Sequence, residues 1–173
     1  MRLWLLGFML VSGIASAAQS MYSMFAAGDY VQPLSVMQQI EKGFSGVIAE
    51  FEMETQEGEL VYQFELINPL ANSITRFEYR ARDGKLLKQK ASKVSADDLA
   101  EVEAARLIAA KNQTFSGIIA KAIKERKAFL TEAKLDHDLG ISYLELKLLD
   151  DTGKFKLAFD VDNLRPLPLL QWD

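Results

Sequence analysis

Apolar residues between positions 36 and 82 change from a helical period to a period of two. Apolar side chains at 36, 37, 40 and 44 follow Ser35, which can cap a helix, and they predict a helix over 36–44. From 47 to 55, apolar residues alternate with glutamates, as a half-buried strand requires. The residues expected to face inward are Val47, Ala49, Phe51 and Met53.

Two more alternating stretches follow, at 60–67 and 75–82, and turns are predicted at Glu57-Gly58 and Asp83-Gly84. The predicted unit is therefore one helix that covers the apolar face of three antiparallel strands. The inward residues of the second and third strands are Leu60, Tyr62, Phe64 and Leu66, followed by Thr75, Phe77, Tyr79 and Ala81.

The same pattern recurs about 82 positions later, which predicts a second copy of the unit. A helix is expected over 117–126, a turn at Leu139-Gly140, and strands before and after that turn. At this shift Phe77 falls on Phe159 and Tyr79 on Val161. The inward residues of the second copy are Phe129, Ala133 and Leu135, then Leu144, Leu146 and Leu148, then Phe155, Leu157, Phe159 and Val161.

These patterns predict an α+β fold of two related units, each a helix packed on a three-stranded antiparallel sheet, with short connecting helices. One connecting helix precedes each unit, and the second opens at Ser95 with a capping box and runs to about Asn112. The units are assigned to residues 18–94 and 95–173. Because a unit of about 60 residues is marginal alone, the two are expected to pack together.

Residues 1–17 have the layout of a secretory signal peptide. Arg2 is followed by an apolar run from Leu3 to Val11 and by Ala15-Ser16-Ala17, which predicts cleavage after Ala17 and a periplasmic location. Cysteine is absent, which argues against lipidation at a cysteine and against disulfides. We expect no stable membrane insertion after cleavage.

The charge balance argues against nucleic acid as a partner. The chain has 20 Lys+Arg and 24 Asp+Glu, a net charge of −4. Cleavage removes only Arg2 among the charged residues. No basic stripe that could follow a phosphate backbone is evident.

Residues 26–90 resemble the PepSY proteins of the periplasm, which are often encoded beside two-component systems, and residues 100–170 do so more weakly. The matching features are Gly28-Asp29, Pro33-Leu34, Gly46-Val47, Val61-Tyr62 and Ala81 with Gly84. Two positions depart from the family pattern. Arg80 replaces the usual aspartate, and the second unit has Asp162 there but Pro166 in place of the final glycine.

The resemblance implies a protein that binds a partner in the cell envelope, such as a sensor kinase, or that inhibits or chaperones a peptidase. Such motifs are turns and strand faces, so they bear on fold more than on function.

The residue inventory predicts no enzyme, no cofactor and no metal site. The one histidine, His137, stands between Asp136 and Asp138 beside a predicted turn, and we interpret it as an exposed turn residue because metal sites need several converging ligands. A weak partner surface is predicted on the outer sheet face, where acidic residues alternate with the core and cationic ones lie on the third strand. Its residues are Glu50, Glu52, Glu54, Glu65, Arg76 and Arg80.

Two hypotheses of different classes follow. The first is an exported, non-catalytic binding or regulatory protein that acts through protein contacts, and a free sheet edge can accept an extended peptide by strand addition. The alternative is a sensor that binds a small ligand or a metal ion between the units. A hydrolase with an unrecognised carboxylate pair is a third, weaker hypothesis. The partner and the oligomeric state are not predicted.

Overall fold

Two hairpins with two-residue turns organise the sheet. Glu57 and Gly58 have φ values of 51° and 85°, and Leu139 and Gly140 have 50° and 78°. Two consecutive residues with positive φ are what a type I′ hairpin turn requires. The turns predicted at Glu57-Gly58 and Leu139-Gly140 are therefore confirmed. The computed structural model describes residues 21–124 and 126–168, so the predicted signal peptide at 1–17 lies outside the described residues.

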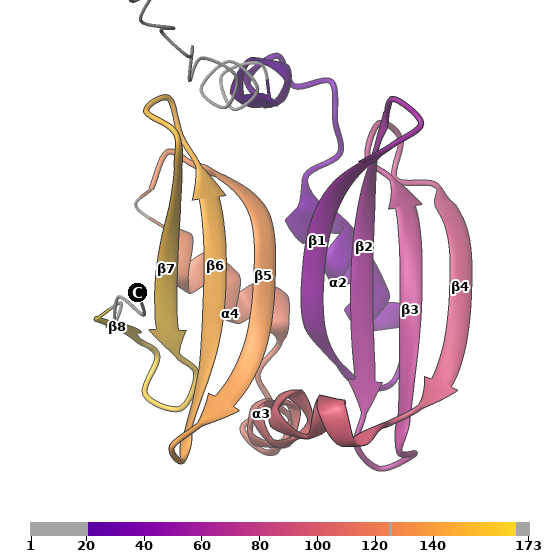
Figure 1. The fold of residues 1–173 in the computed structure, drawn as a ribbon, viewed down its shortest axis with the longest axis vertical. Helices are drawn as coiled ribbons and strands as arrows, with labels where there is room; N and C mark the ends of the chain where they lie inside the picture. Colours follow the sequence, from indigo (N-terminus) through magenta and orange to yellow (C-terminus); the bar gives the residue numbers. More distant parts are fainter. Residues whose placement is uncertain (1–20, 125, 169–173) are drawn as a thin grey trace, which may run out of the picture.

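The first half of the described chain forms four strands and one helix that packs on them (Figure 1). A helical segment at 21–26 precedes it. The elements of the first half are α2 (Pro33–Gly43), β1 (Val47–Gln56), β2 (Glu59–Asn68), β3 (Ser73–Arg80) and β4 (Leu86–Lys93).

The second half repeats this order after a connection made by a 3-10 helix and α3. The connecting elements are η1 (Ala96–Asp98) and α3 (Leu99–Ala110). The elements of the second half are α4 (Phe115–Ile123), β5 (Phe129–Asp138), β6 (Ile141–Leu149), β7 (Lys154–Asp160) and β8 (Arg165–Leu167).

The two halves form one antiparallel sheet in the order β4-β3-β2-β1-β5-β6-β7-β8. The predicted fold class, two units with three-stranded sheets, is therefore wrong. Each half has four strands, and β1 pairs with β5 across the middle. The physical reason is that a separate three-stranded unit would leave the edge of β1 unpaired, and pairing with β5 satisfies both edges at once.

The central pairing is symmetric with respect to the repeat. Phe51 lies opposite Ala133, and these positions are 82 residues apart, the same distance that separates the start of β1 from that of β5. Glu50 pairs with Lys134 and Glu52 with Glu132, so each strand meets its own repeat in reverse order. This is the geometry of a two-fold, self-complementary interface, here built within one chain.

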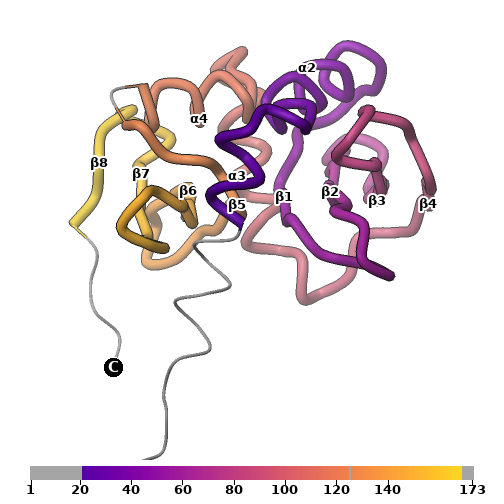
Figure 2. The backbone as a smooth tube through the Cα atoms, turned by 90° about the horizontal axis from the view of Figure 1, so that it is seen from above, coloured from indigo at the N-terminus to yellow at the C-terminus, as the bar shows by residue number. Residues whose placement is uncertain are grey.

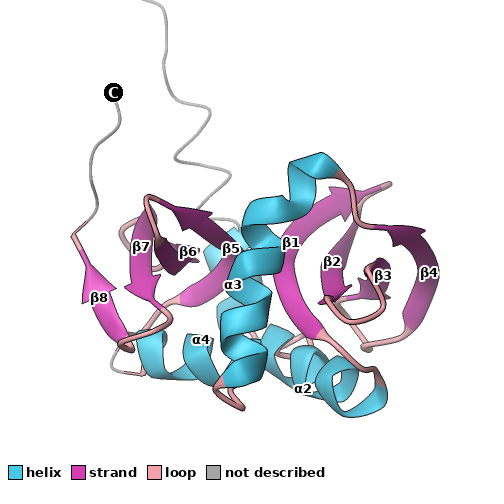
Figure 3. Ribbon diagram, turned by 90° about the horizontal axis from the view of Figure 1, so that it is seen from below, coloured by secondary structure: helices cyan, strands magenta, loops and turns pink. Residues whose placement is uncertain are grey.

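The core runs through both halves. Helices α2 and α4 lie side by side on one face of the sheet (Figure 2). Val36, Met37 and Ile40 of α2 and Phe115, Ile118 and Ile119 of α4 are buried in one cluster with the inward residues of β1, β2, β5 and β6. Helix α3 lies at the end of the sheet where β1 begins and β5 ends (Figure 3).

The third strand of the second half is offset from its expected alignment. Tyr62 pairs with Tyr79 and Leu144 with Phe159, so Phe159 corresponds to Tyr79 and not to Phe77. The loop before β7 is effectively two residues shorter: Ile67 pairs with Ile74, whereas Leu149 pairs with Lys154. Because a shift of two keeps the same face inward, the predicted burial pattern survives although the alignment does not.

Candidate functional site

The predicted acidic surface is only partly assembled. Glu50, Glu52, Glu65 and Arg76 line a shallow groove of about 160 Å³ on the sheet. Arg76 Nε lies 2.7 Å from Glu65 Oε2, across the β2–β3 pair. Arg80 does not join them, because it pairs with Glu59 at 3.3 Å and with Asp83 at 3.1 Å.

The glutamates of this surface repel one another at the centre of the sheet. Glu52 lies opposite Glu132 in the β1–β5 pair, and like charges in that position are unfavourable. Burial, followed by the charges of Glu54, Glu132 and Glu50, raises the pKa of Glu52 above its usual range. Burial also raises the pKa of Glu65, although Arg76 opposes the shift. Glu54 is held by Gln63, whose Nε2 donates to it at 2.8 Å.

A sizeable recess lies beside α3, in the second half of the molecule. We call it the α3 pocket, and its volume is about 600 Å³. Its walls are one face of α3, the β5–β6 hairpin and the turn between β7 and β8. The lining residues are Glu103, Arg106, Leu107, Ala110, His137, Gly140, Ile141, Ser142, Asp160, Asp162, Asn163 and Arg165.

His137 and Ser142 form a hydrogen-bonded pair inside this pocket. His137 Nδ1 lies 2.8 Å from Ser142 Oγ, and Ser142 is 5% exposed. The imidazole therefore satisfies a buried hydroxyl. The interpretation of His137 as an exposed turn residue is wrong, because the residue is half-buried and belongs to β5. Among the described residues, no hydrogen bond to a carboxylate is found at the second ring nitrogen, so the third member that orients the base in a catalytic triad is not seen there.

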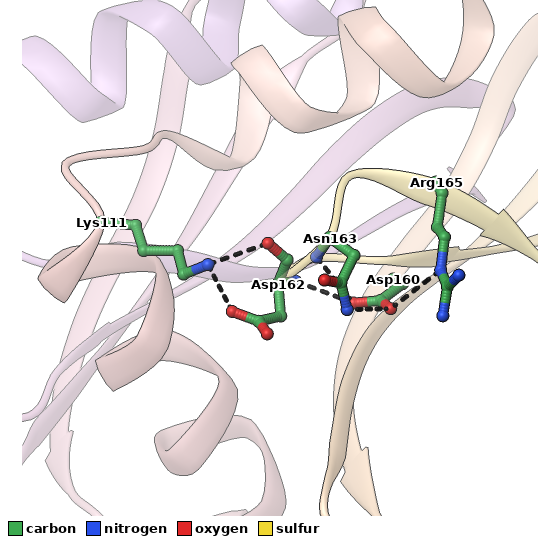
Figure 4. Close-up of polar contacts among 5 residues, drawn as sticks. All are labelled: Lys111, Asp160, Asp162, Asn163 and Arg165. Atoms are coloured by element: carbon green, nitrogen blue, oxygen red, sulfur yellow. Dashed lines mark hydrogen bonds and ion pairs between the residues drawn. The ribbon is translucent and has the colours of Figure 1, made fainter.

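Asp160 organises the turn on the other side of the pocket (Figure 4). Its side chain accepts hydrogen bonds from the backbone N–H groups of Asp162 (2.9 Å) and Asn163 (3.0 Å), and from Asn163 Nδ2 (2.8 Å). Burial alone would raise the pKa of Asp160, but the bonds from Asn163 and the backbone outweigh it and lower the pKa. Lys111 Nζ ties the turn to the end of α3 by donating to the Asp162 carbonyl at 2.8 Å and by an ion pair with its carboxylate.

The polar groups of the α3 pocket are thus mostly engaged with one another. Arg106 pairs with Glu103 at 2.6 Å, and Arg165 lies 3.7 Å from Asp160. Within the described residues, no group of three or more potential metal ligands is gathered anywhere. The pocket can admit a small polar molecule, which would have to compete with these internal contacts.

The two edges of the sheet differ in length and in composition. At one edge, β4 offers eight residues, all exposed except the half-buried Ser92. At the other, β8 has three residues, and the middle one is Pro166. A short edge strand with a proline resists further pairing, whereas a long exposed edge leaves backbone N–H and C=O groups free to accept a strand.

The edge at β4 is also strongly cationic. Residues 84–94 contain four lysines and no acidic residue. Lys88 pairs with Glu78 at 2.8 Å, and no ion pair between Lys85, Lys90 or Lys93 and another described residue is found. Sequence reasoning missed this strand because it has no alternation, but the run of like charge after the Asp83-Gly84 turn was a usable signal.

Comparison with known proteins gives no family. No family model matches the chain, and no curated protein matches it. A crystal structure described as a "putative lipoprotein" from Clostridium difficile 630 aligns with a TM-score of 0.43 and 20% identity, covering 81% of this chain and 93% of that one. At this level of similarity the match carries no argument, and the resemblance to PepSY proteins stays a prediction. No helix in the described ranges 21–124 and 126–168 is long and apolar enough to cross a bilayer.

Proposed function

We propose that this chain is an exported, non-catalytic binding protein that acts through contacts with another protein in the cell envelope, and that β4 is the contact element. A sensor kinase or a peptidase is the class of partner that the PepSY resemblance implies. The proposal joins the secretory layout of residues 1–17 to one structural asymmetry, the open edge at β4.

The observation that carries the proposal is the contrast between the two sheet edges. The outer edges of β1 and β5 pair with each other in the middle of the sheet, and β8 is short and contains Pro166. Only β4 combines length, exposure and an unpaired side among the eight strands described. An extended segment of a partner can add to such an edge, with main-chain hydrogen bonds supplying affinity.

Site-specific photo-crosslinking in cells tests this proposal. A photoreactive amino acid is placed at Gln89 or at Ala91 on β4, and at Leu167 on β8 and Thr152 in the β6–β7 loop as matched controls. We expect one discrete adduct from the β4 positions, identified by mass spectrometry as an envelope protein, and none from the controls. Equal adducts from all four positions, or none from β4, would contradict the proposal.

Export is tested separately. Cell fractionation followed by N-terminal sequencing should find the protein in the periplasm with its first residue at Ala18. Recovery in the cytoplasm with Met1 intact would reject the location without bearing on the edge.

A second candidate function is the binding of a small polar molecule, and the α3 pocket favours it. Ligand sites usually have volumes of about 300–1,000 Å³, and this pocket lies within that range at about 600 Å³. Calorimetry with divalent cations and with free amino acids, on wild type and on His137→Ala, tests it. Heat that disappears in the variant supports the pocket as a site, and the absence of heat with every probe removes this candidate.

A further inference from the structure

We infer that the partner segment bound by β4 is an extended peptide with acidic side chains at alternate positions. The inference rests on the proposed function and specifies the chemistry of its ligand. It follows from where the lysines of β4 stand relative to the strand beside them.

Lys88 and Lys90 project from the same face of the sheet, because side chains two apart in a strand share a face. Their neighbours on β3 are Glu78 and Arg76. Lys88 is satisfied by Glu78, but Lys90 lies opposite Arg76, a like charge. Arg76 is itself engaged by Glu65 on its other side. Lys90 therefore has a repulsive neighbour on one side and an unoccupied edge on the other.

A strand added beside β4 would place its side chains about 4.5–5.5 Å, Cβ to Cβ, from those of Lys88 and Lys90. Acidic residues two apart on that strand would face both lysines at once. Lys85, directly before β4, and Lys93, its last residue, add positive charge near the two ends of the edge, although Lys93 projects from the opposite face to Lys88 and Lys90. The ligand class is thus an extended segment of the form acid-x-acid, with main-chain bonds to β4 and carboxylates toward its lysines.

The surroundings favour a peptide over a nucleic acid. Glu50, Glu52 and Glu65 lie on the same sheet, in the groove that Arg76 also lines. A phosphate backbone would need a wider cationic surface than one edge strand provides. The lysines of β4 form one narrow cationic line, which suits a single strand with a few carboxylates that stays on the edge, away from the repelling glutamates of the groove.

Fluorescence anisotropy with labelled peptides on the mature protein tests the inference. The probes are peptides of about ten residues, a length suited to an edge strand, in which threonine alternates with glutamate, glutamine or lysine. We expect the glutamate peptide to bind at least about tenfold more tightly than the glutamine peptide, a difference of about 1.4 kcal/mol. We expect no binding of the lysine peptide. Lys90→Glu should weaken binding of the glutamate peptide about tenfold or more, whereas Lys154→Glu, the same charge change on an exposed lysine of β7, should not.

Backbone methylation distinguishes strand addition from attraction of charge alone. An added strand uses every second N–H group, so methylating one alternate set should abolish binding and methylating the other should not. Equal binding of both methylated peptides, or equal binding of a single-stranded oligonucleotide of the same charge, would overturn the inference. So would binding unaffected by Lys90→Glu, which would leave the lysines as guards against aggregation. Crosslinks from β4 in cells, combined with no preference for acidic peptides, would defeat this inference but leave the proposed function standing. Binding of acidic peptides to β4 without any crosslink in cells would instead count against the proposed function.

Discussion

The two halves of the sheet share a framework and differ at their margins. Helices α2 and α4 begin 82 residues apart, at Pro33 and Phe115, and β1 and β5 show the same register irregularity, between Ile48 and Glu50 and between Leu130 and Glu132. At the outer edges the likeness ends, because β4 is long and cationic whereas β8 is short and contains Pro166.

The ends of the strands differ as well. Arg80, which pairs with exposed acids, corresponds by strand register to the buried Asp160, because Val61 pairs with Arg80 and Tyr143 with Asp160. Leu60 and Ser142 are the second residues of β2 and β6 and occupy equivalent places, but only Ser142 has a polar side chain, which contacts His137. The shared positions are those that pack the core, so the differing margins are where a function specific to this chain is to be sought.

The largest expected effect tests whether the halves fold as one body. Phe51 is fully buried at the central pairing, and Phe51→Ala should lower the free energy of unfolding by about 3–5 kcal/mol. Urea unfolding of the wild type and of the variant, monitored by hydrogen exchange in both halves, should show one transition. The substitution should shift that transition to lower urea by the same amount in the two halves. As a control, Leu70→Ala, at a fully exposed side chain, should change stability by less than about 0.5 kcal/mol. Two separate transitions would mean that each half is an independent unit.

The next prediction compares Asp160 with Arg80. Asp160→Ala leaves three hydrogen-bond donors without their partner and should cost about 1–3 kcal/mol, whereas Arg80→Ala should cost less than about 1 kcal/mol. Because the pKa of Asp160 is lowered in the fold, its contribution is full above the unfolded value of 3.8 and is lost as pH falls through the folded pKa. Chemical denaturation at neutral and strongly acidic pH should show the Asp160→Ala difference shrinking in acid. A difference independent of pH would reject this explanation.

A contact between α2 and α4 breaks the symmetry of the repeat. Glu41 accepts hydrogen bonds from the backbone N–H of Ser116 at 2.9 Å and from its hydroxyl at 2.5 Å. The repeat places Ile123 at the position of Glu41 and Leu34 at the position of Ser116, and these two apolar side chains cannot form such a bond. Glu41→Ala should cost about 0.5–2 kcal/mol, as loss of a helix cap does. A double-mutant cycle with Ser116→Ala should return a coupling energy well above zero, and simple additivity would show that the contact is not significant.

The smallest effect concerns the repulsion between Glu52 and Glu132. Since the pKa of Glu52 is raised in the fold, its ionised form destabilises the protein above the folded pKa, and acidification relieves the cost. Glu52→Gln should therefore stabilise the protein at neutral pH by about 0.2–1 kcal/mol, and the gain should disappear as pH falls to the unfolded pKa. Thermal unfolding of the two proteins across this pH range measures it. A loss of stability at neutral pH would contradict the repulsion.

The sequence predicted what depends on alternation. Inward residues such as Tyr62 and Leu144 are fully buried as expected, and the helices at Pro33–Gly43 and Phe115–Ile123 occur close to their predicted places. These features are local, because apolar residues spaced with a period of two or of 3.6 indicate which face of the strand or helix is buried.

What the sequence did not predict depends on pairing between distant strands. β4 has no apolar alternation because both of its faces are exposed, and β8 is too short and contains a proline. The pairing of Phe51 with Ala133 cannot be predicted from the sequence of either strand alone. The α3 pocket was missed for the same reason, since α3, His137 and Asp160 meet only through the tertiary fold.

If the proposed function is right, β4 receives an added strand and its counterpart β8 does not. Hydrogen–deuterium exchange of the mature protein, with and without a saturating peptide of alternating threonine and glutamate, measures this directly. We expect alternate amides of β4 to gain protection while those of Arg165–Leu167 exchange at unchanged rates. Unchanged exchange along β4 at saturation, or protection confined to the residues of the α3 pocket, would contradict it.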